Sequence, residues 1–428
     1  MGKAGRPARL ELLCVGSELL VGQLNTHEAR LGLELRRAGL NLCRASTFPD
    51  DGKALAAEMK AALARSDALI VCGGLGPTFD DVTREAASAA LGRKLTYKPA
   101  LYAAIERKYL AHRLTIPEEN KRQAFALDGA EVLENRWGSA PGQFVTLRRG
   151  SAAPKALALL PGPTSEMAPI FAEHVLPRLV RLYAKGVAAA HLSVHVAGLS
   201  ESEADEKLQP LIKEAGPEMS FTILSSGGQV DFHVSAMASK KAAAEKLIAA
   251  ARARIDAALG AHVFGEGSDT LESVLGRELK RRGLTLAVAE SCTGGLVGAR
   301  ITAVPGSSDY FLGGVLAYAN AAKTALLSVS EKTLAARGAV SAECAREMAE
   351  GARRALGADV GLSITGVAGP SGGTAEKPVG LVYVCAALRG REITRELRLS
   401  GGRDLVRARA ATAALHAALR LVAFRQQD

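Results

Sequence analysis

Short apolar runs that end in glycine or proline and pass straight into helical patterns are the feature that most constrains this fold. Three such units lie in residues 10–184, and they begin at "LELLCVG", "DALIVCGGLGPTFDD" and "ALALLPGPTSEM". A repeated strand, glycine turn and helix is typical of a parallel sheet with crossover helices. The same pattern returns in residues 268–424, where "LTLAVAES" precedes two glycines and a helix.

Residues 185–265 follow a different pattern. "HLSVHVAGL" and "VDFHVSAMA" alternate like half-exposed strands, and a helical stretch follows each of them. We expect a small α+β domain here. The predicted fold class is therefore α/β, with a parallel-sheet domain at each end of the chain and this smaller domain between them. A chain of 428 residues is long enough for several cores.

The composition narrows the class of ligand. The six cysteines are scattered, with no Cys-x-x-Cys or Cys/His cluster, which fits a reduced cytosol and argues against a zinc site or a disulfide framework. No run approaches transmembrane length, so no membrane partner is expected. The net charge is +10 but aromatic residues make up only 4%, which favours anionic small molecules over nucleic acid.

The turn after "LTLAVAE" carries several side chains that could act as nucleophiles. In open α/β sheets, ligands bind at the carboxyl ends of the strands. The free N–H groups of the helical turn that follows can hold an oxyanion there. The candidate nucleophiles and substrate-binding residues of this turn are Ser291, Cys292, Thr293, Gly294 and Gly295.

A serine nucleophile needs a base, and the histidines of this block nearly exclude a Ser-His-Asp triad, since only His416 follows residue 268. Lys323 follows "GGVLAYANAA", where an apolar strand gives way to a polar turn. A lysine in a partly dry crevice, near other positive groups, can lose its proton and act as the base. Arginine cannot do this.

Three other interpretations of these residues stay open. Ser291 or Thr293 could simply cap the helix, and Lys323 could be a solvated surface residue. Cys292 could be the nucleophile, although its side chain should point away from that of Ser291 on an extended strand end.

A second glycine loop, "TGVAGPSGGTAEKPVG", fits close approach of the backbone to a ligand, or else a long hairpin connection. In "SGGRDLVRARA", two arginines lie four residues apart at a helix start. They could meet a phosphate, or pair with Asp404 and solvent. The candidate substrate-binding residues here are Gly366, Gly369, Gly372, Gly373, Arg403 and Arg407.

Five stretches of this block resemble, in the same order, the C-terminal domain of the CinA family of competence/damage-inducible proteins. They are "AESCTGG", "YANAAK", "GAVS", "SITGVAGPSGGTAEKPVGLVYV" and "SGGRDLVR". The resemblance implies nicotinamide mononucleotide amidohydrolase (deamidase) activity that needs no cofactor. It also implies a catalytic serine–lysine pair at Ser291 and Lys323, with the family's tyrosine at Tyr318 and its threonine at Thr365.

In the first block, "GGLGPT" presents backbone N–H groups that could hold a phosphate. Two carboxylates, Asp80 and Asp81, follow at a helix start, where they could hold a divalent cation or simply favour the first helical turn. The candidate phosphate-binding residues are Gly73, Gly74, Gly76 and Thr78.

"CVGSELLVGQLNT", "VCGGLGPTFDDVTREA", "NKRQA", "GSAPGQF" and "LLPGPTSEM" resemble the N-terminal domain of the same family, whose fold is similar to that of molybdopterin-binding proteins. This implies an ADP-ribose pyrophosphatase that uses a divalent metal (Mg²⁺, Mn²⁺ or Co²⁺) and potassium, with metal ligands at Glu18, Asp80 and Asp81. The family's Gly-Asp-Glu is here Gly-Ser-Glu, with Ser17 in place of the aspartate, so a weakened metal site is expected.

The middle segment resembles the family's KH-like linker domain. It lacks a Gly-x-x-Gly nucleic-acid loop, so we interpret it as structural, with a role in the contacts of a homodimer.

Together these patterns favour a cytoplasmic enzyme of pyridine nucleotide salvage. It would convert nicotinamide mononucleotide to nicotinic acid mononucleotide and ammonia, with a weakened ADP-ribose pyrophosphatase in the first domain. The alternative is a non-enzymatic nucleotide- or pterin-binding interaction protein associated with competence. That alternative predicts no ammonia release from any pyridine nucleotide.

Overall fold

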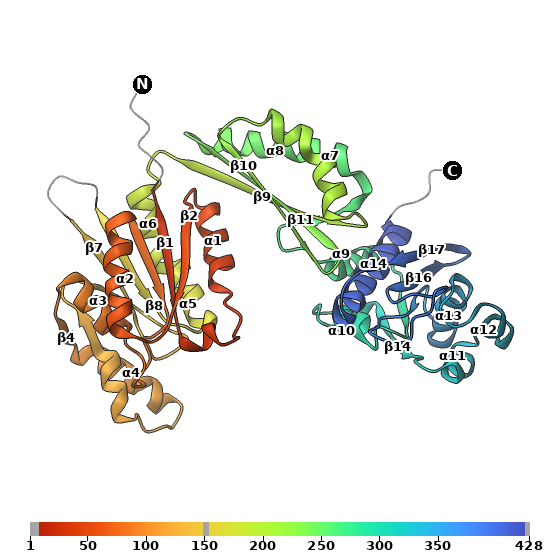
Figure 1. Ribbon diagram of the computed structural model, residues 1–428, viewed down its shortest axis with the longest axis horizontal. Helices are drawn as coiled ribbons and strands as arrows, with labels where there is room; N and C mark the ends of the chain where they lie inside the picture. Colours follow the sequence, from red (N-terminus) through yellow and green to blue (C-terminus); the bar gives the residue numbers. More distant parts are fainter. Residues whose placement is uncertain (1–7, 149–153, 424–428) are drawn as a thin grey trace. The chain divides into compact units, whose positions relative to one another are not determined.

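The computed structural model of the protein describes residues 8–148 and 154–423 (Figure 1). These residues form two compact units. One contains residues up to 191 together with 235–247, and the other contains residues 192–234 together with those from 248 onward. No helix among the described residues combines the length and the apolar character needed to cross a bilayer.

The first unit is built on a six-stranded sheet with the order β2-β1-β3-β8-β7-β6. The first four strands run parallel, and β7 and β6 add antiparallel pairs at one edge. All six residues of β1 are buried, as expected for a central parallel strand covered on both faces. The strands are β1 (Leu10–Val15), β2 (Leu42–Phe48), β3 (Ala68–Cys72), β6 (Glu131–Leu133), β7 (Gly142–Leu147) and β8 (Lys155–Leu160).

Helices cover both faces of this sheet. One core packs α1, α5 and α6 against the sheet, and the other packs α2 and α3 against the opposite face (Figure 1). A short antiparallel pair, β4 (Leu95–Tyr97) with β5 (Phe125–Leu127), lies beside α4 in the sequence. The helices are α1 (His27–Arg37), α2 (Gly52–Arg65), α3 (Thr83–Leu91), α4 (Pro99–Ala111), α5 (Thr164–Ile170) and α6 (Leu176–Tyr183).

The middle segment forms a four-stranded sheet with the order β10-β11-β9-β12, which confirms the small α+β domain. Its apolar core joins the sheet to two helices. Strand β10 was not expected from the sequence, because its side chains are mostly half-exposed and do not alternate clearly. The elements are β9 (Ala188–Ala197), α7 (Glu201–Glu214), β10 (Met219–Ser226), β11 (Gln229–Ala238), α8 (Lys241–Leu259) and β12 (Val263–Glu266).

The C-terminal part contains a five-stranded sheet with the order β14-β13-β15-β16-β17. Strand β13 lies parallel to both of its neighbours, whereas β16 and β17 pair antiparallel, so the sheet is mixed. The strands are β13 (Leu286–Glu290), β14 (Phe311–Leu316), β15 (Val360–Gly366), β16 (Leu381–Leu388) and β17 (Arg391–Arg398).

Helices again cover both faces of this sheet, with α9, α10 and α14 on one side and α11 and α13 on the other. Helix α9 illustrates the local encoding: Thr270 and Ser273 form a capping box at its start, and Gly283, with a φ of 63°, ends it. The helices are α9 (Leu271–Arg282), α10 (Leu296–Thr302), α11 (Asn320–Leu327), α12 (Glu331–Arg337), α13 (Ala342–Leu356) and α14 (Arg403–Ala423).

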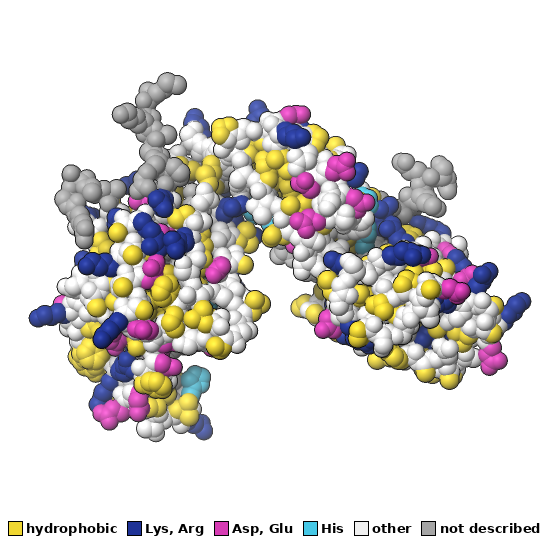
Figure 2. Space-filling model, viewed as in Figure 1, with side chains coloured by type: hydrophobic (Ala, Val, Ile, Leu, Met, Phe, Trp, Pro, Cys, Tyr) yellow, Lys and Arg dark blue, Asp and Glu magenta, His cyan; other side chains and the backbone are white. Residues whose placement is uncertain are grey.

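Figure 2 shows basic side chains distributed over the visible surfaces of both units, with acidic side chains among them.

The predicted mixture of three α/β and α+β blocks is confirmed. What matters for function is where the parallel strands end, because each sheet gathers its glycine turns at that edge.

Candidate functional site

Ser291 and Lys323 meet in the C-terminal part of the chain. Ser291 directly follows β13, and Lys323 lies on α11, the helix that follows the neighbouring strand β14. The Lys323 Nζ lies 3.1 Å from the Ser291 Oγ, although 32 residues separate them. Both side chains are buried, with exposed fractions of 8% for Ser291 and 1% for Lys323.

The lysine lies on a helix, not on the polar turn expected from the sequence. The polar residues of "YANAAK" begin α11, so the turn itself is only the short stretch before Asn320. Burial on this helix also excludes the interpretation of Lys323 as a solvated surface residue.

Two backbone carbonyls complete the surroundings of the Lys323 amine. The Nζ donates to the oxygen of Ala317 at 2.8 Å and to that of Tyr318 at 3.1 Å. A neutral amine has two N–H groups and one lone pair. If the carbonyls take the two N–H groups, the lone pair faces the Ser291 hydroxyl, as a general base requires.

Burial lowers the pKa of Lys323 below its ordinary value, because the charged ammonium loses its hydration. The nearby thiols of Cys344 and Cys292 oppose this shift but do not outweigh it. No neighbouring cation is needed, which corrects the expectation that other positive groups would depress the pKa.

Two backbone donors of the turn after Ser291 bind no carbonyl or carboxylate. The Gly294 N–H donates to the Ser291 carbonyl, and the Gly295 N–H donates to the Glu290 carboxylate. Among the described residues, the N–H groups of Cys292 and Thr293 donate to no carbonyl or carboxylate, and that of Cys292 faces its own thiol. Gly294 is therefore not a free donor, contrary to expectation.

The N-cap of helix α10 is Gly295, and the Ser291 hydroxyl contacts Lys323 and not an N–H group of this helix. The Thr293 hydroxyl is fully buried and has no partner among the described residues. The capping interpretation of these two side chains is therefore wrong.

Cys292 lies in the apolar core beneath the turn and is only 5% exposed. Burial raises the pKa of its thiol to about 11. A thiol of this kind carries little thiolate at neutral pH, so Cys292 is a poor nucleophile.

The side chains of Tyr318 and Thr365 form their hydrogen bonds with residues other than Ser291 and Lys323. The Tyr318 hydroxyl accepts from Arg403 at 3.1 Å, and only its backbone carbonyl contacts Lys323. The Thr365 hydroxyl is buried and donates to the carbonyl of Ala339 at 2.7 Å.

The two arginines of α14 reach both glycine-rich loops. Arg403 donates to the Gly369 carbonyl at 2.7 Å, and Arg407 donates to the Thr293 carbonyl at 2.8 Å. Arg407 also forms an ion pair with Asp404, which agrees with the interpretation that it pairs with this residue. Gly366 ends β15, while Gly372 and Gly373 lie in the exposed part of the following loop.

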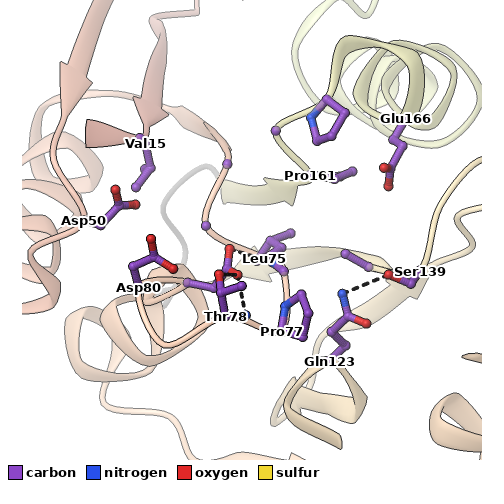
Figure 3. Close-up of a pocket in the computed structure, with 18 of the residues that line it drawn as sticks. Val15, Asp50, Leu75, Pro77, Thr78, Asp80, Gln123, Ser139, Pro161 and Glu166 are labelled. Atoms are coloured by element: carbon purple, nitrogen blue, oxygen red, sulfur yellow. Dashed lines mark hydrogen bonds between the residues drawn. The ribbon is translucent and has the colours of Figure 1, made fainter. Parts of the chain in front are cut away.

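A second candidate site lies at the edge of the N-terminal sheet (Figure 3). Gly16, Gly73 and Gly162 follow three neighbouring parallel strands and line a cavity of about 350 Å³. All the residues predicted to bind phosphate or metal in this domain also line it: Gly73, Gly74, Gly76, Thr78, Glu18, Asp80 and Asp81.

The carboxylate of Asp81 is already bound within the loop. It accepts from the Gly76 N–H at 2.7 Å, from the Thr78 N–H at 2.8 Å and from the Thr78 hydroxyl at 2.5 Å. Asp81 therefore holds the glycine loop in shape, which accounts for its position without a metal.

Asp50 is a pocket residue that the sequence analysis missed. It follows β2, and its carboxylate accepts from both the N–H and the hydroxyl of Ser17 at 2.8 Å. Figure 3 shows the carboxylates of Asp50 and Asp80 on the same side of the pocket. The position of "FPD" just after a strand that neighbours β1 would have indicated it, because parallel strands end at one edge. Glu166, on α5, also lines the pocket and was missed.

The residues present do not form a metal site. No group of three His, Cys, Asp or Glu side chains that could hold a metal ion occurs in residues 8–148 and 154–423. Glu18 and Asp80 are exposed, and Asp81 is occupied by loop donors. Glu18, Asp80 and Asp81 thus share a pocket without forming the expected metal cluster.

Family models match three consecutive parts of the chain. A probable molybdopterin binding domain matches residues 11–181, the KH domain of damage-inducible protein CinA matches 191–265, and the CinA C-terminal domain matches 268–422. The three matches lie within the three blocks expected from the sequence.

Relatives cover nearly the whole chain. A protein of Moorella thermoacetica named as competence-damage inducible is 43% identical over 408 residues, which cover 95% of this chain and 97% of that protein. A CinA-like protein of Dictyoglomus turgidum is 40% identical, over 93% of this chain and 95% of its own length.

Solved structures of CinA proteins match part of the chain. The crystal structure of a competence/damage inducible protein from Agrobacterium tumefaciens is 38% identical in sequence, covers 35% of this chain and 93% of its own, and has a TM-score of 0.35. From the near full-length relatives and the three matched domains, the chain belongs to the CinA family of competence/damage-inducible proteins, with a molybdopterin-binding-like domain, a KH domain and a CinA C-terminal domain.

Proposed function

We propose that the C-terminal domain hydrolyses the carboxamide of nicotinamide mononucleotide to nicotinic acid mononucleotide and ammonia. The observation that carries this proposal is the buried contact of 3.1 Å between the Lys323 amine and the Ser291 hydroxyl. The resemblance of the surrounding motifs to the CinA C-terminal domain supports the choice of nicotinamide mononucleotide as the substrate. The geometry alone supports only a serine–lysine acyl transfer.

In the proposed first step, the neutral Lys323 amine takes the proton of the Ser291 hydroxyl as its oxygen attacks the carboxamide carbon. The carbonyl oxygen becomes an oxyanion, for which the N–H groups of Cys292 and Thr293 are the nearest donors of the turn that bind no carbonyl or carboxylate. When the intermediate collapses, the carbon–nitrogen bond breaks and the lysine returns its proton to the leaving nitrogen, which departs as ammonia.

In the second step, water hydrolyses the nicotinoyl ester of Ser291. The Lys323 amine, now neutral again, takes a proton from the attacking water, and the hydroxyl of Ser291 is re-formed as the acid leaves. The two carbonyls that hold the lysine fix its position through both steps.

Arg403 and Arg407 supply positive charge beside the turn. Both guanidinium groups reach backbone carbonyls of the glycine loops, so their positions are fixed, and Arg403 remains open to solvent. A fixed guanidinium is well suited to the phosphate of a mononucleotide. We assign the phosphate to these two residues as part of the proposal.

The test is direct. Purified full-length protein incubated with nicotinamide mononucleotide should release one ammonia for each nicotinic acid mononucleotide formed, measured by an enzyme-coupled ammonia assay and chromatography. The Ser291→Ala variant should release none above background while its circular dichroism spectrum is unchanged. Absence of release by the wild-type protein would instead favour a non-enzymatic interaction protein associated with competence.

For the N-terminal domain we propose that the ADP-ribose pyrophosphatase implied by the family resemblance is weak or absent. Ser17 replaces a family carboxylate, its hydroxyl and N–H both bind Asp50, and Asp81 is occupied by its own loop. The pocket keeps its glycine-lined floor and several carboxylates, so it remains a candidate for ligand binding.

A further inference from the structure

Glu290 is connected by hydrogen bonds both to the turn that follows Ser291 and, through Ala317, to Lys323. It is the last residue of β13 and is 1% exposed, so its carboxylate lies in the protein interior. Its backbone carbonyl accepts from the N–H of Ala317, whose own carbonyl accepts from Lys323. Its side chain extends the other way, into the turn that follows Ser291.

The Glu290 carboxylate occupies the donors at the start of α10. It accepts from the N–H groups of Gly295 at 3.0 Å, Val297 at 3.1 Å and Gly298 at 2.9 Å. Three bonds from backbone N–H groups to one buried carboxylate are charge-assisted, and they neutralise the positive end of the helix.

The other N–H groups of the turn complete the pattern. Ser291 donates to the carbonyl of Ile364, and Gly294 donates to that of Ser291. In the described turn only the N–H groups of Cys292 and Thr293 donate to no carbonyl or carboxylate, and they belong to the two residues that follow Ser291. These two N–H groups are therefore the donors of the turn that an oxyanion formed at Ser291 could use.

We propose that Glu290 is a positioning residue for the amide hydrolysis, an inference that rests on the proposed function. By taking three N–H groups, it removes the start of α10 as an anion site and fixes the turn so that Cys292 and Thr293 direct their N–H groups to the oxyanion. Through Ala317 the same residue is connected to the lysine. Glu290 itself touches neither substrate nor reacting atoms.

The variant Glu290→Gln tests this role because it keeps the size of the side chain but replaces one acceptor oxygen with an NH₂ donor. That donor would face backbone N–H groups, so the turn must shift. Losing a single oxyanion donor lowers kcat about 10²- to 10³-fold in hydrolases, and a displaced pair should cost at least about tenfold. KM should change less than about threefold, since substrate binding does not use the oxyanion donors.

A matched control comes from Glu272, which is also buried and also anchors α10. Its carboxylate pairs with Arg300 on that helix but does not contact the turn. The variant Glu272→Gln should lose stability to heat, as should Glu290→Gln, yet keep the kcat of the wild type. Unfolding temperatures from circular dichroism would show that the two variants are comparably folded.

A fluorophosphonate gives a second measurement that does not depend on the natural substrate. It reacts with an activated serine, forming the oxygen–phosphorus bond while fluoride leaves, and its phosphoryl oxygen uses the same donors. Labelling of Ser291, followed by mass spectrometry, should be at least about tenfold slower in Glu290→Gln than in Glu272→Gln. If the wild-type protein is labelled but releases no ammonia, the proposed substrate is contradicted. The labelling rates of the two variants would still test the role of Glu290.

Equal kcat in Glu290→Gln and wild type would overturn the proposal. So would equal losses in the two variants, because they would indicate only a structural role. If Glu290→Gln does not fold, Glu290→Asp decides by the same criteria, since its shorter carboxylate keeps the charge but cannot reach all three N–H groups.

Discussion

The two strand-end sites use the same local device with opposite results. In each, a carboxylate beside a glycine turn accepts from the backbone N–H groups of that turn: Glu290 in the C-terminal domain and Asp81 in the N-terminal domain. At the first site this leaves the Ser291 hydroxyl and the Lys323 amine, the proposed nucleophile and base, in contact. At the second it withdraws a carboxylate that would otherwise be available to a metal.

The two sites differ in how deeply their polar side chains are buried. The Ser291–Lys323 contact is shielded from water, so the lysine loses its hydration and its pKa falls. Glu18 and Asp80 face solvent, where nothing forces them together. An acidic residue next to a glycine turn is therefore weak evidence for a ligand site, whereas a buried lysine against a serine is strong evidence for chemistry.

The largest effect is expected at the serine–lysine pair. We predict that Ser291→Ala and Lys323→Met each lower kcat on nicotinamide mononucleotide by at least about 10³-fold. The double variant should lose no more than either single variant, because the two groups act as one unit. Single-turnover ammonia release measures this. Independent, multiplicative losses would contradict the assigned contact.

The activity should also depend on pH through Lys323. The active form of Lys323 is the neutral amine, so kcat/KM should fall about tenfold per pH unit below its pKa in the free enzyme. Because burial lowers that pKa, the midpoint should lie below the ordinary lysine value of about 10.4. A profile of kcat/KM against pH checks this. A midpoint at the ordinary value would mean that the lysine is hydrated.

The sequence predicted the α/β blocks because strand, glycine and helix alternate visibly. It also indicated that Ser291 and Lys323 could meet, because few histidines lie near Ser291, and the two side chains are in contact. It did not predict that Lys323 lies on a helix, since eight residues of α11 contain too little periodic pattern to distinguish them from a turn.

The contacts that complete each site could not be predicted from spacing. Ser17 and Asp50 are 33 residues apart and meet only because their strands lie side by side. Glu290 looks like one more polar residue of "AESCTGG", and its role depends on where three later N–H groups point. Such contacts come from tertiary packing, which a local pattern does not contain.

A single substitution would give the N-terminal pocket the carboxylate that the family resemblance implies at position 17. We predict that Ser17→Asp raises ADP-ribose cleavage at least about tenfold in Mn²⁺ or Co²⁺, because it places a second carboxylate against Asp50 and so favours a divalent cation. Chromatography of AMP formed, with and without potassium, measures this. Ser17→Asn is the control, since it adds no charge. Wild-type cleavage as fast as that of the variant would contradict the proposed weakness.

The smallest effect is expected at Cys292, the neighbour of Ser291. We predict that Cys292→Ala changes kcat by no more than about threefold and costs about 1 kcal/mol of unfolding free energy, because the thiol only fills the core. Iodoacetamide should leave the activity of the wild type intact at neutral pH, since the pKa of this thiol is about 11. If Cys292→Ala lowered kcat as much as Ser291→Ala, the nucleophile would be the sulfur of Cys292. The contact between Ser291 and Lys323 would then have no catalytic role.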